Sequence, residues 1–245
     1  MTDAPVDFSL VVACYNEAPI LEASMREVFR VLDALKWTSE IVFVDDKSRD
    51  ETLAVIDRIV RANPQRAMRV IAHPTNVGRG GTVTDGIRAS RGTYAGFIDI
   101  DLEVHVRYLL PCLLALDAGA DVVTAKRIYR FQWRSFDRFL MSRGYVWIRQ
   151  RLVPAPVEDT ETGYKLFRRD RILPVLDQCQ DRGWFWDTEV LVRAFYAGLK
   201  IVEVPVLFLR RFDKPSSVRP IRDTLAYLGR LWRFRAVVRA LPRSR

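Results

Sequence analysis

The chain has 245 residues, of which 49% are hydrophobic and 28% charged, and its formal net charge is +9. This apolar content excludes disorder as the dominant state and is ample for one large folded domain. No run approaches the ~18 consecutive apolar residues that a membrane span needs. The three cysteines, Cys14, Cys112 and Cys179, have no metal-ligand spacing, which favours a reduced, cytoplasmic chain.

The positive charge is concentrated in two segments. Residues 1–125 carry a net charge of −5 and residues 152–204 carry −2, whereas residues 126–151 carry +7 and residues 205–245 carry +9. Most of the chain is therefore close to neutral. The two basic segments need separate explanations, because a uniformly basic surface for polyanions is not what the sequence indicates.

Short apolar runs alternate with amphipathic stretches through the first half of the chain. Strands are expected at 8–13, 41–44, 69–72 and 94–98, with helices between them. Further on, the pattern predicts the following elements: a strand at 121–125, a loop leading into a strand over 159–168, a helix at 187–196, a strand at 200–209 and a basic helix at 221–241 after Pro220. This order predicts an α/β fold with a mainly parallel sheet and helices on both faces.

Polar residues follow the first two expected strands, at 13–17 and 44–52. Ligands of such sheets bind at the carboxyl ends of the strands. Ser48 and Asp50 precede an apolar helix and are interpreted as helix N-caps. Asp46 lies between the strand and these caps and is interpreted as a ligand-binding carboxylate.

A glycine-rich loop, 76–81, follows the third strand, and its spacing differs from the dinucleotide-binding fingerprint. A plain turn and a phosphate contact at the following helix N-terminus are about equally expected. The two histidines, His73 and His105, are too few for a zinc cluster and are expected to be surface or loop residues.

The fourth strand ends in Asp99-Ile-Asp101-Leu-Glu103. In an extended chain these three carboxylates would share one face, because side chains alternate along a strand. Carboxylate oxygens suit Mg²⁺ or Mn²⁺, and a bound diphosphate would complete the coordination. The residues therefore predict a divalent metal site at this strand end.

The combination of motifs resembles inverting family 2 glycosyltransferases of GT-A fold, and within them the dolichyl- or polyprenyl-phosphate mannose and glucose synthases. The likeness runs from about residue 10 to about residue 219. Its carriers are Tyr15-Asn16-Glu17, Val44-Asp45-Asp46-x-Ser48-x-Asp50-x-Thr52, Asn76-x-Gly78-x-Gly80, Asp99-x-Asp101-Leu102-Glu103, Asp159-x-x-Thr162-Gly163-Tyr164-Lys165-Leu166-Phe167 and Phe185-x-Asp187-x-Glu189.

The resemblance implies how the donor, a nucleotide sugar such as GDP-mannose or UDP-glucose, is bound. Residues after the first two strands would surround its nucleoside: Ala13, Tyr15, Glu17, Val44 and Asp46. Asp99, Asp101 and Glu103 would hold Mg²⁺ or Mn²⁺, with Asp99 and Asp101 as the catalytic pair. Arg211 matches an arginine of the family that contacts the nucleotide phosphates.

The resemblance also implies a polyprenyl or dolichyl phosphate acceptor, which would receive the hexose with inversion. Arg127, Arg138 and Ser142 match the residues that grip the acceptor phosphate. Aromatic residues interleave with the arginines of this block, as a surface for a lipid phosphate would require.

One enzymatic alternative remains open. A family 2 transferase acting on a saccharide or small-molecule hydroxyl would need a carboxylate base, for which Asp159, Asp187 and Glu189 are candidates. Nucleic acid is not expected as a partner, because a nucleic-acid-binding role leaves the clustered carboxylates at the strand ends, which would repel phosphates, unexplained.

The expected organisation is a GT-A domain at 1–219 and a C-terminal basic amphipathic helix at 220–245. That helix either binds the inner face of the cytoplasmic membrane peripherally or packs on the domain.

Overall fold

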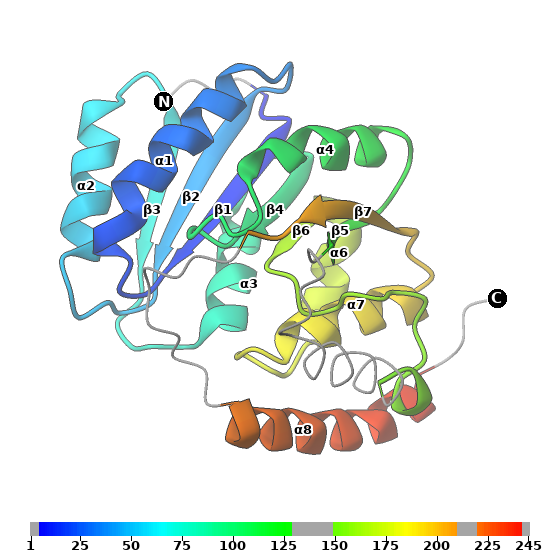
Figure 1. Ribbon diagram of the computed structural model, residues 1–245. Helices are drawn as coiled ribbons and strands as arrows, with labels where there is room; N and C mark the ends of the chain where they lie inside the picture. Colours follow the sequence, from blue (N-terminus) through cyan, green and yellow to red (C-terminus); the bar gives the residue numbers. More distant parts are fainter. Residues whose placement is uncertain (1–4, 129–148, 210–219, 242–245) are drawn as a thin grey trace.

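The computed structural model describes residues 5–128, 149–209 and 220–241. Within these ranges seven strands form one sheet in the order β3-β2-β1-β4-β6-β5-β7 (Figure 1). The strands are β1 (Phe8–Cys14), β2 (Ser39–Asp45), β3 (Ala67–Ala72), β4 (Tyr94–Ile98), β5 (Val122–Ile128), β6 (Tyr164–Arg168) and β7 (Ile201–Leu207). The helices are α1 (Ala18–Asp33), α2 (Thr52–Ala62), α3 (Arg79–Ala89), the 3-10 turn η1 (Val106–Tyr108), α4 (Leu109–Asp117), α6 (Arg169–Leu176), α7 (Trp186–Tyr196) and α8 (Pro220–Ala240).

The sheet is mainly parallel, as the alternating pattern predicts. β1 pairs in parallel with both β2 and β4, β2 pairs in parallel with β3, and β5 with β7. β6 is the exception, because it lies antiparallel between β4 and β5. This insertion brings the segment before β6 to the carboxyl end of β4, where Gly163 accepts a hydrogen bond from the Asp99 amide at 2.8 Å.

Helices cover both faces of the sheet, and side-chain alternation decides which residues meet them. One face packs its buried aliphatic residues against α1, α2 and α4. The other face packs against α3, α6 and α7, with Trp186 of α7 buried at its centre. Along β1, for example, Leu10 and Val12 belong to the first cluster and Val11 to the second.

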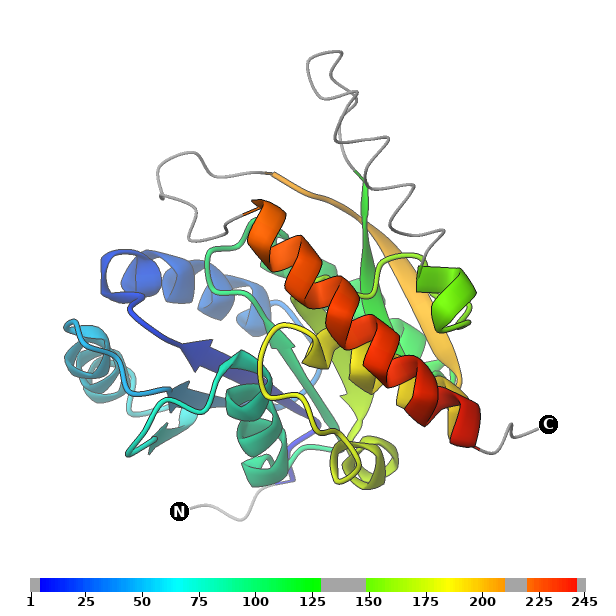
Figure 2. The same ribbon diagram turned by 90° about the horizontal axis from the view of Figure 1, so that it is seen from below.

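Helix α8 forms a further layer outside α7 (Figures 1 and 2). Leu231, Phe234 and Val238 are buried in a third cluster with residues of α7 and of the segment 152–155. An ion pair of 2.9 Å between Arg230 and Asp181 joins α8 to the loop before α7. Packing on the domain therefore accounts for one face of the helix. No helix in the described ranges is long and apolar enough to cross a membrane.

Candidate active site

Three non-glycine residues in left-handed backbone conformations mark one edge of the sheet. Asn16, Lys47 and Leu102 have φ values of 57°, 62° and 55°. They follow the carboxyl ends of β1, β2 and β4, which are neighbours in the sheet. Such conformations are unfavourable for residues with a side chain and cluster at functional sites. The candidate site is therefore at this edge, where α/β sheets bind ligands.

The loop between β2 and α2 satisfies backbone amides at the start of two helices. Asp50 accepts hydrogen bonds from the amide of Thr52 at 3.0 Å and from the amide of Ala18 at 3.2 Å. Ser48 accepts one from the amide of Asn16 at 3.0 Å. The capping prediction is wrong for both residues, because the N-cap of α2 is Glu51, which makes no side-chain cap hydrogen bond. Asp50 instead holds the first amide of the helix from the position before the cap. Both side chains also fix the entry to α1, which the sequence pattern does not reveal.

Asp46 is buried and organises the glycine-rich loop. Its carboxylate accepts hydrogen bonds from the amides of Val77 at 2.8 Å and Gly78 at 2.9 Å. The ring nitrogen Nδ1 of His73 lies 3.0 Å from the same carboxylate. This histidine lies in the loop after β3, as expected, but its side chain is turned inward and is only 9% exposed. The amide of Gly81 donates to the carbonyl of Arg182. Because protein groups already engage these amides, the structure favours the plain turn over the phosphate contact.

The residues expected around the nucleoside differ in accessibility. Tyr15 is exposed, and Ala13 and Glu17 are partly exposed beside it. Val44 is fully buried in the hydrophobic core, and Asp46 is buried under its loop. The accessible part of this set is thus the turn after β1.

The acidic motif after β4 does not continue the strand. β4 ends at Ile98, and the amide of Leu102 donates to the carbonyl of Asp99 at 3.2 Å, which closes a turn. The expectation of three carboxylates on one face of an extended chain is therefore wrong. The left-handed conformation of Leu102 breaks the alternation on which it was based.

Among the described residues, no group of three or more carboxylate, histidine or cysteine side chains is arranged to hold a metal ion. The chemistry of the turn nevertheless fits a hard divalent cation, because Asp99, Asp101 and Glu103 supply carboxylate oxygens within five residues. A cation at this turn would need further oxygen ligands from a bound diphosphate.

A chain of charges runs from this turn into the interior. Asp99, whose side chain is 46% exposed, pairs with Arg79 at 2.7 Å. Arg79 also pairs with Asp187, whose other oxygen receives Lys165 at 2.6 Å. Burial alone would lower the pKa of Arg79, but Asp187 and Asp99 outweigh it and raise the pKa above its usual value. Burial lowers the pKa of Lys165, against the opposing effect of Asp187.

The packing around Arg79 holds this network in place. The guanidinium lies over the rings of Phe97 and Trp184, at 5.2 and 5.0 Å from their centres. A side chain at Gly163 would collide with the carboxylate of Asp99. A β-carbon at this position, directly before β6, would displace the carboxylate of Asp99 from where it meets Arg79.

Arg127 forms a two-point ion pair with Asp159. The distances are 2.7 Å from Nε to Oδ2 and 2.9 Å from Nη2 to Oδ1, and the amide of Arg127 also donates to Oδ2 at 3.1 Å. Burial alone would raise the pKa of Asp159, but the hydrogen bonds and charge of Arg127 outweigh burial and lower it. Arg138, Ser142 and Arg211, the other residues expected at phosphates, lie outside the described residues.

The three carboxylates considered as catalytic bases all have cationic partners. Asp159 pairs with Arg127, and Asp187 with Arg79 and Lys165. Glu189 pairs with Arg193 at 2.7 Å on α7 and accepts two backbone hydrogen bonds from the loop before that helix. Both oxygens of each carboxylate therefore already accept hydrogen bonds from protein groups, which leaves neither free to receive a proton from a substrate hydroxyl.

Sequence reasoning assigned no role to Arg79, Lys165, Gly163 or His73. Arg79 and Lys165 lie inside motifs that the sequence pattern singled out, at 76–81 and 159–167. An arginine inside a glycine-rich turn could have indicated a charged group at the site. Its pairing with Asp187, 108 residues away, could not have been predicted from the sequence pattern.

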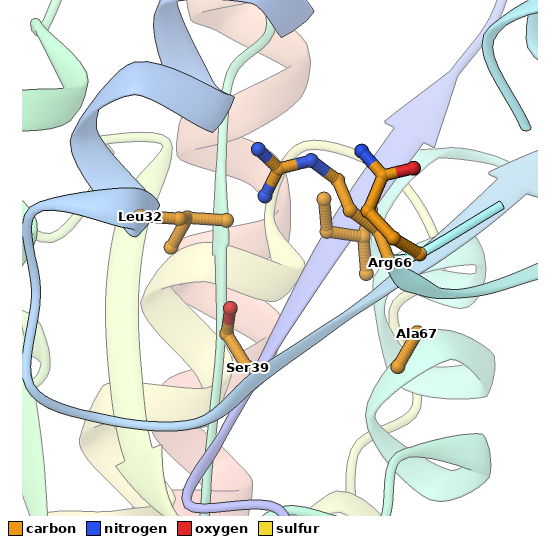
Figure 3. Close-up of a pocket in the computed structure, with 6 residues that line it drawn as sticks. Leu32, Ser39, Arg66 and Ala67 are labelled. Atoms are coloured by element: carbon orange, nitrogen blue, oxygen red, sulfur yellow. The ribbon is translucent and has the colours of Figure 1, made fainter. Parts of the chain in front are cut away.

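A small hollow of about 230 Å³ lies at the opposite edge of the sheet, where β2 and β3 begin (Figure 3). Ser39, Arg66 and Ala67 are among its lining residues. None of the expected site residues lines it.

Comparison with known proteins places these observations in a family. Residues 9–173 match the family model described as glycosyl transferase family 2. The glycosyltransferase AglD of Haloferax volcanii is 30% identical over 94% of this chain, which spans 38% of AglD. A dolichyl-phosphate beta-glucosyltransferase of Dictyostelium discoideum is 28% identical over 95% of this chain and 79% of its own length. The human dolichyl-phosphate beta-glucosyltransferase is 28% identical over 83% of this chain and 68% of its own length.

The fold has a counterpart among solved structures. Glucosyl-3-phosphoglycerate synthase of Mycobacterium tuberculosis, in complex with Mn²⁺, UDP and glucosyl-3-phosphoglycerate, aligns with a TM-score of 0.66 and 18% identity. The alignment covers 98% of this chain and 81% of that chain. At this identity the likeness establishes the architecture, a GT-A-type α/β sheet. The family match, the relatives and the shared fold together show that this chain is a glycosyltransferase and belongs to glycosyl transferase family 2.

Proposed function

We propose that this glycosyltransferase moves glucose from UDP-glucose to a polyprenyl or dolichyl phosphate, with inversion at the sugar C1. The names of two relatives, dolichyl-phosphate beta-glucosyltransferases, support this acceptor and sugar. The solved structures with UDP or UDP-glucose support a uridine nucleotide. GDP-mannose is the competing donor.

The observation that carries the acceptor class is the pairing of the candidate bases. Asp159, Asp187 and Glu189 are each held by a cation, so none is poised to deprotonate a sugar or alcohol hydroxyl. A lipid phosphate needs no such base, because it is ionised at neutral pH. One of its oxygens forms the bond to C1 while the C1–O bond to the diphosphate breaks, and the departing UDP takes the electron pair. Catalysis then rests on positioning and charge neutralisation.

The site residues divide between the two substrates. Ala13, Tyr15 and Glu17, in and after the end of β1, border the nucleoside. Val44 and Asp46, which are buried, support this part of the site from the interior. Arg127 meets the acceptor phosphate by sharing its guanidinium with Asp159, and Arg138, Ser142 and Arg211 complete the phosphate contacts.

Asp99, Asp101 and Glu103 would hold Mg²⁺ or Mn²⁺, which neutralises charge on the nucleoside diphosphate when bound. The Mn²⁺ or Mg²⁺ named in the solved structures supports this assignment. Arg79, at the start of α3, pairs with Asp99 and so holds a positive charge beside the proposed metal site.

The test is sugar transfer to matched acceptors. Radiolabelled UDP-glucose and GDP-mannose are each offered with a polyprenyl phosphate and with the corresponding polyprenol, which lacks only the phosphate. We expect glucose to be transferred to the phosphate and not to the alcohol. Transfer to the polyprenol or to saccharides, with none to the lipid phosphate, would instead support the hydroxyl-acceptor alternative.

The metal assignment has its own controls. Asp101→Ala should abolish transfer while leaving the unfolding temperature close to that of the unaltered chain, because Asp101 lies in a turn and is partly exposed. Chelation with EDTA should also abolish transfer, and added Mn²⁺ should restore it. Full activity in EDTA would rule out the metal role.

We also propose that the outer face of α8 rests on a membrane surface. This face exposes Trp232, Arg233 and Arg239, while the opposite face is buried on the domain. Deleting residues 220–245 would uncover the third cluster, so the sharper test is Trp232→Ala with Arg233→Gln. Reduced co-sedimentation with anionic vesicles is expected, and unchanged co-sedimentation would contradict the proposal.

A further inference from the structure

An exposed aliphatic surface lies where β5 and β7 end. Ile128, Leu207 and Leu209 are 49%, 49% and 62% exposed. Ile128 and Leu207 are directly paired across the two parallel strands, and Leu209 follows two residues later. We call these three side chains the β5–β7 aliphatic patch. Three neighbouring aliphatic residues exposed at strand ends are unlike the scattered single ones found on any protein surface.

Side-chain alternation places the patch on a definite face of the sheet. Along β5, Val123 and Ala125 belong to the core under α4, whereas Val122 belongs to the core under α7. Ile128 has the same parity as Val122 and therefore lies on the α7 face. Leu207 lies on this face as well, because its neighbour Val206 packs into the opposite core. The charges of Arg79, Lys165 and Asp187 lie on the same side, packed against Phe97 and α7.

The patch also borders the expected substrate residues. The amide of Leu209 donates to the carbonyl of Glu103 at 2.8 Å, and Val104 forms a bridge with Phe208. Arg127 precedes Ile128 in the chain, and its guanidinium lies over the ring of Phe208 at 5.7 Å. Alternation sends the Arg127 side chain off the face opposite to Ile128, because its partner Val206 packs into the core under α4. The patch therefore adjoins Glu103 and Arg127 at the ends of β5 and β7, without sharing one face of the sheet with Arg127.

We propose that the β5–β7 aliphatic patch binds the isoprenoid chain of the acceptor, next to its phosphate; this inference rests on the proposed function. The surface is aliphatic throughout, which suits a hydrocarbon chain and not a sugar or a base. The competing explanation for the exposed patch is a dimer in which a strand of a second copy pairs with the end of β7. The structure favours this explanation less. The bridge to Val104 and the hydrogen bond to Glu103 already engage the backbone of 208–209 on its outer side.

The test compares two acceptors with the same phosphate, a long-chain polyprenyl phosphate and a short, water-soluble isoprenyl phosphate, both in one detergent. The variants are Leu207→Gln, Leu209→Gln and the double substitution. Each side chain is about half-covered already, so each replacement should raise KM for the long-chain acceptor roughly three- to tenfold. The double variant should raise it more, with KM for the short acceptor changed less than about twofold and UDP-glucose affinity unaltered.

Leu114→Gln is the matched control, because Leu114 is a leucine of similar exposure, 48%, on α4 away from this edge. It should leave both acceptors unaffected. Equal effects on long and short acceptors, or none on either, would overturn the inference while transfer itself upholds the proposed function. A change in oligomeric state without a chain-length effect would overturn it in favour of a contact between copies. If the unaltered chain glycosylates neither lipid phosphate, the proposed function is wrong and the inference falls with it.

Discussion

Replacing Asp187 by asparagine would leave the buried cations Arg79 and Lys165 without their shared counter-ion. The Asp187 side chain is 2% exposed and that of Lys165 is fully buried, so water cannot replace the lost charge. Breaking a buried pair of this kind destabilises proteins by roughly 3–5 kcal/mol. We expect about 3 kcal/mol for Asp187→Asn, because the amide oxygen still accepts one hydrogen bond and Asp99 still balances Arg79.

Thermal and urea unfolding measure this effect. In a chain of this size 1 kcal/mol corresponds to roughly 2–4 °C, so Tm should fall by roughly 6–12 °C. Asp177→Asn is the control, because it removes the carboxylate of an exposed pair with Arg88, 2.8 Å apart, whose loss should change stability by less than about 1 kcal/mol. Adding Lys165→Met to Asp187→Asn should recover part of the loss, since it removes the uncompensated cation. The reasoning is refuted if Asp187→Asn destabilises no more than Asp177→Asn.

Three further predictions concern single residues. Gly163→Ala should lower transfer at least about tenfold and weaken the thermal shift caused by UDP with Mn²⁺, because the new β-carbon displaces the carboxylate of Asp99; an unchanged shift would contradict this. The stabilisation contributed by Asp159, whose pKa is lowered, is present above the ordinary value of about 3.9 and is lost as pH falls through the lower folded value. The deficit of Asp159→Asn in unfolding free energy should therefore be full at neutral pH and shrink below about pH 4, and a deficit independent of pH would disprove it. Burial raises the pKa of Cys112 to about 12, so iodoacetamide at about pH 8 should label it only in denaturant, as mass spectrometry can establish; rapid labelling of the folded chain would contradict the burial.

Local patterns were sufficient for the strands, for most of the helices and for the edge of the sheet that carries the site, whereas α4 and α6 were not predicted. The apolar run 8–13 is almost entirely buried in β1, and a parallel sheet with helices on both faces follows from such runs. That Asp50 accepts a hydrogen bond at the start of α2 also follows locally, because Asp50 and the Thr52 amide are only two residues apart, although the N-cap itself is Glu51. Placement of ligand-binding residues at strand ends requires only the order of the elements.

The turn after β4 shows where local reasoning fails. Asp99, Asp101 and Glu103 alternate in sequence as they would on a strand, yet β4 ends one residue before them. The left-handed conformation of Leu102 has no local signature, because glycine or asparagine would be expected at such a position. The amide of Asp99 still pairs with Gly163 before β6, and the chain turns only after it, which no local pattern shows.

The sequence by itself determined the family, the α/β class and the places in the chain where polar residues meet at one sheet edge. Each of these depends on periodicity or on motifs a few residues long. The tertiary structure decided which charges neutralise one another and which aliphatic residues stay exposed. Arg79 meets Asp187 across 108 residues, because α3 and α7 pack on the same face of the sheet. Arg127 meets Asp159 across 32 residues, because the antiparallel strand β6 lies beside β5. Charge pairing is set by distance in space, which no local pattern encodes.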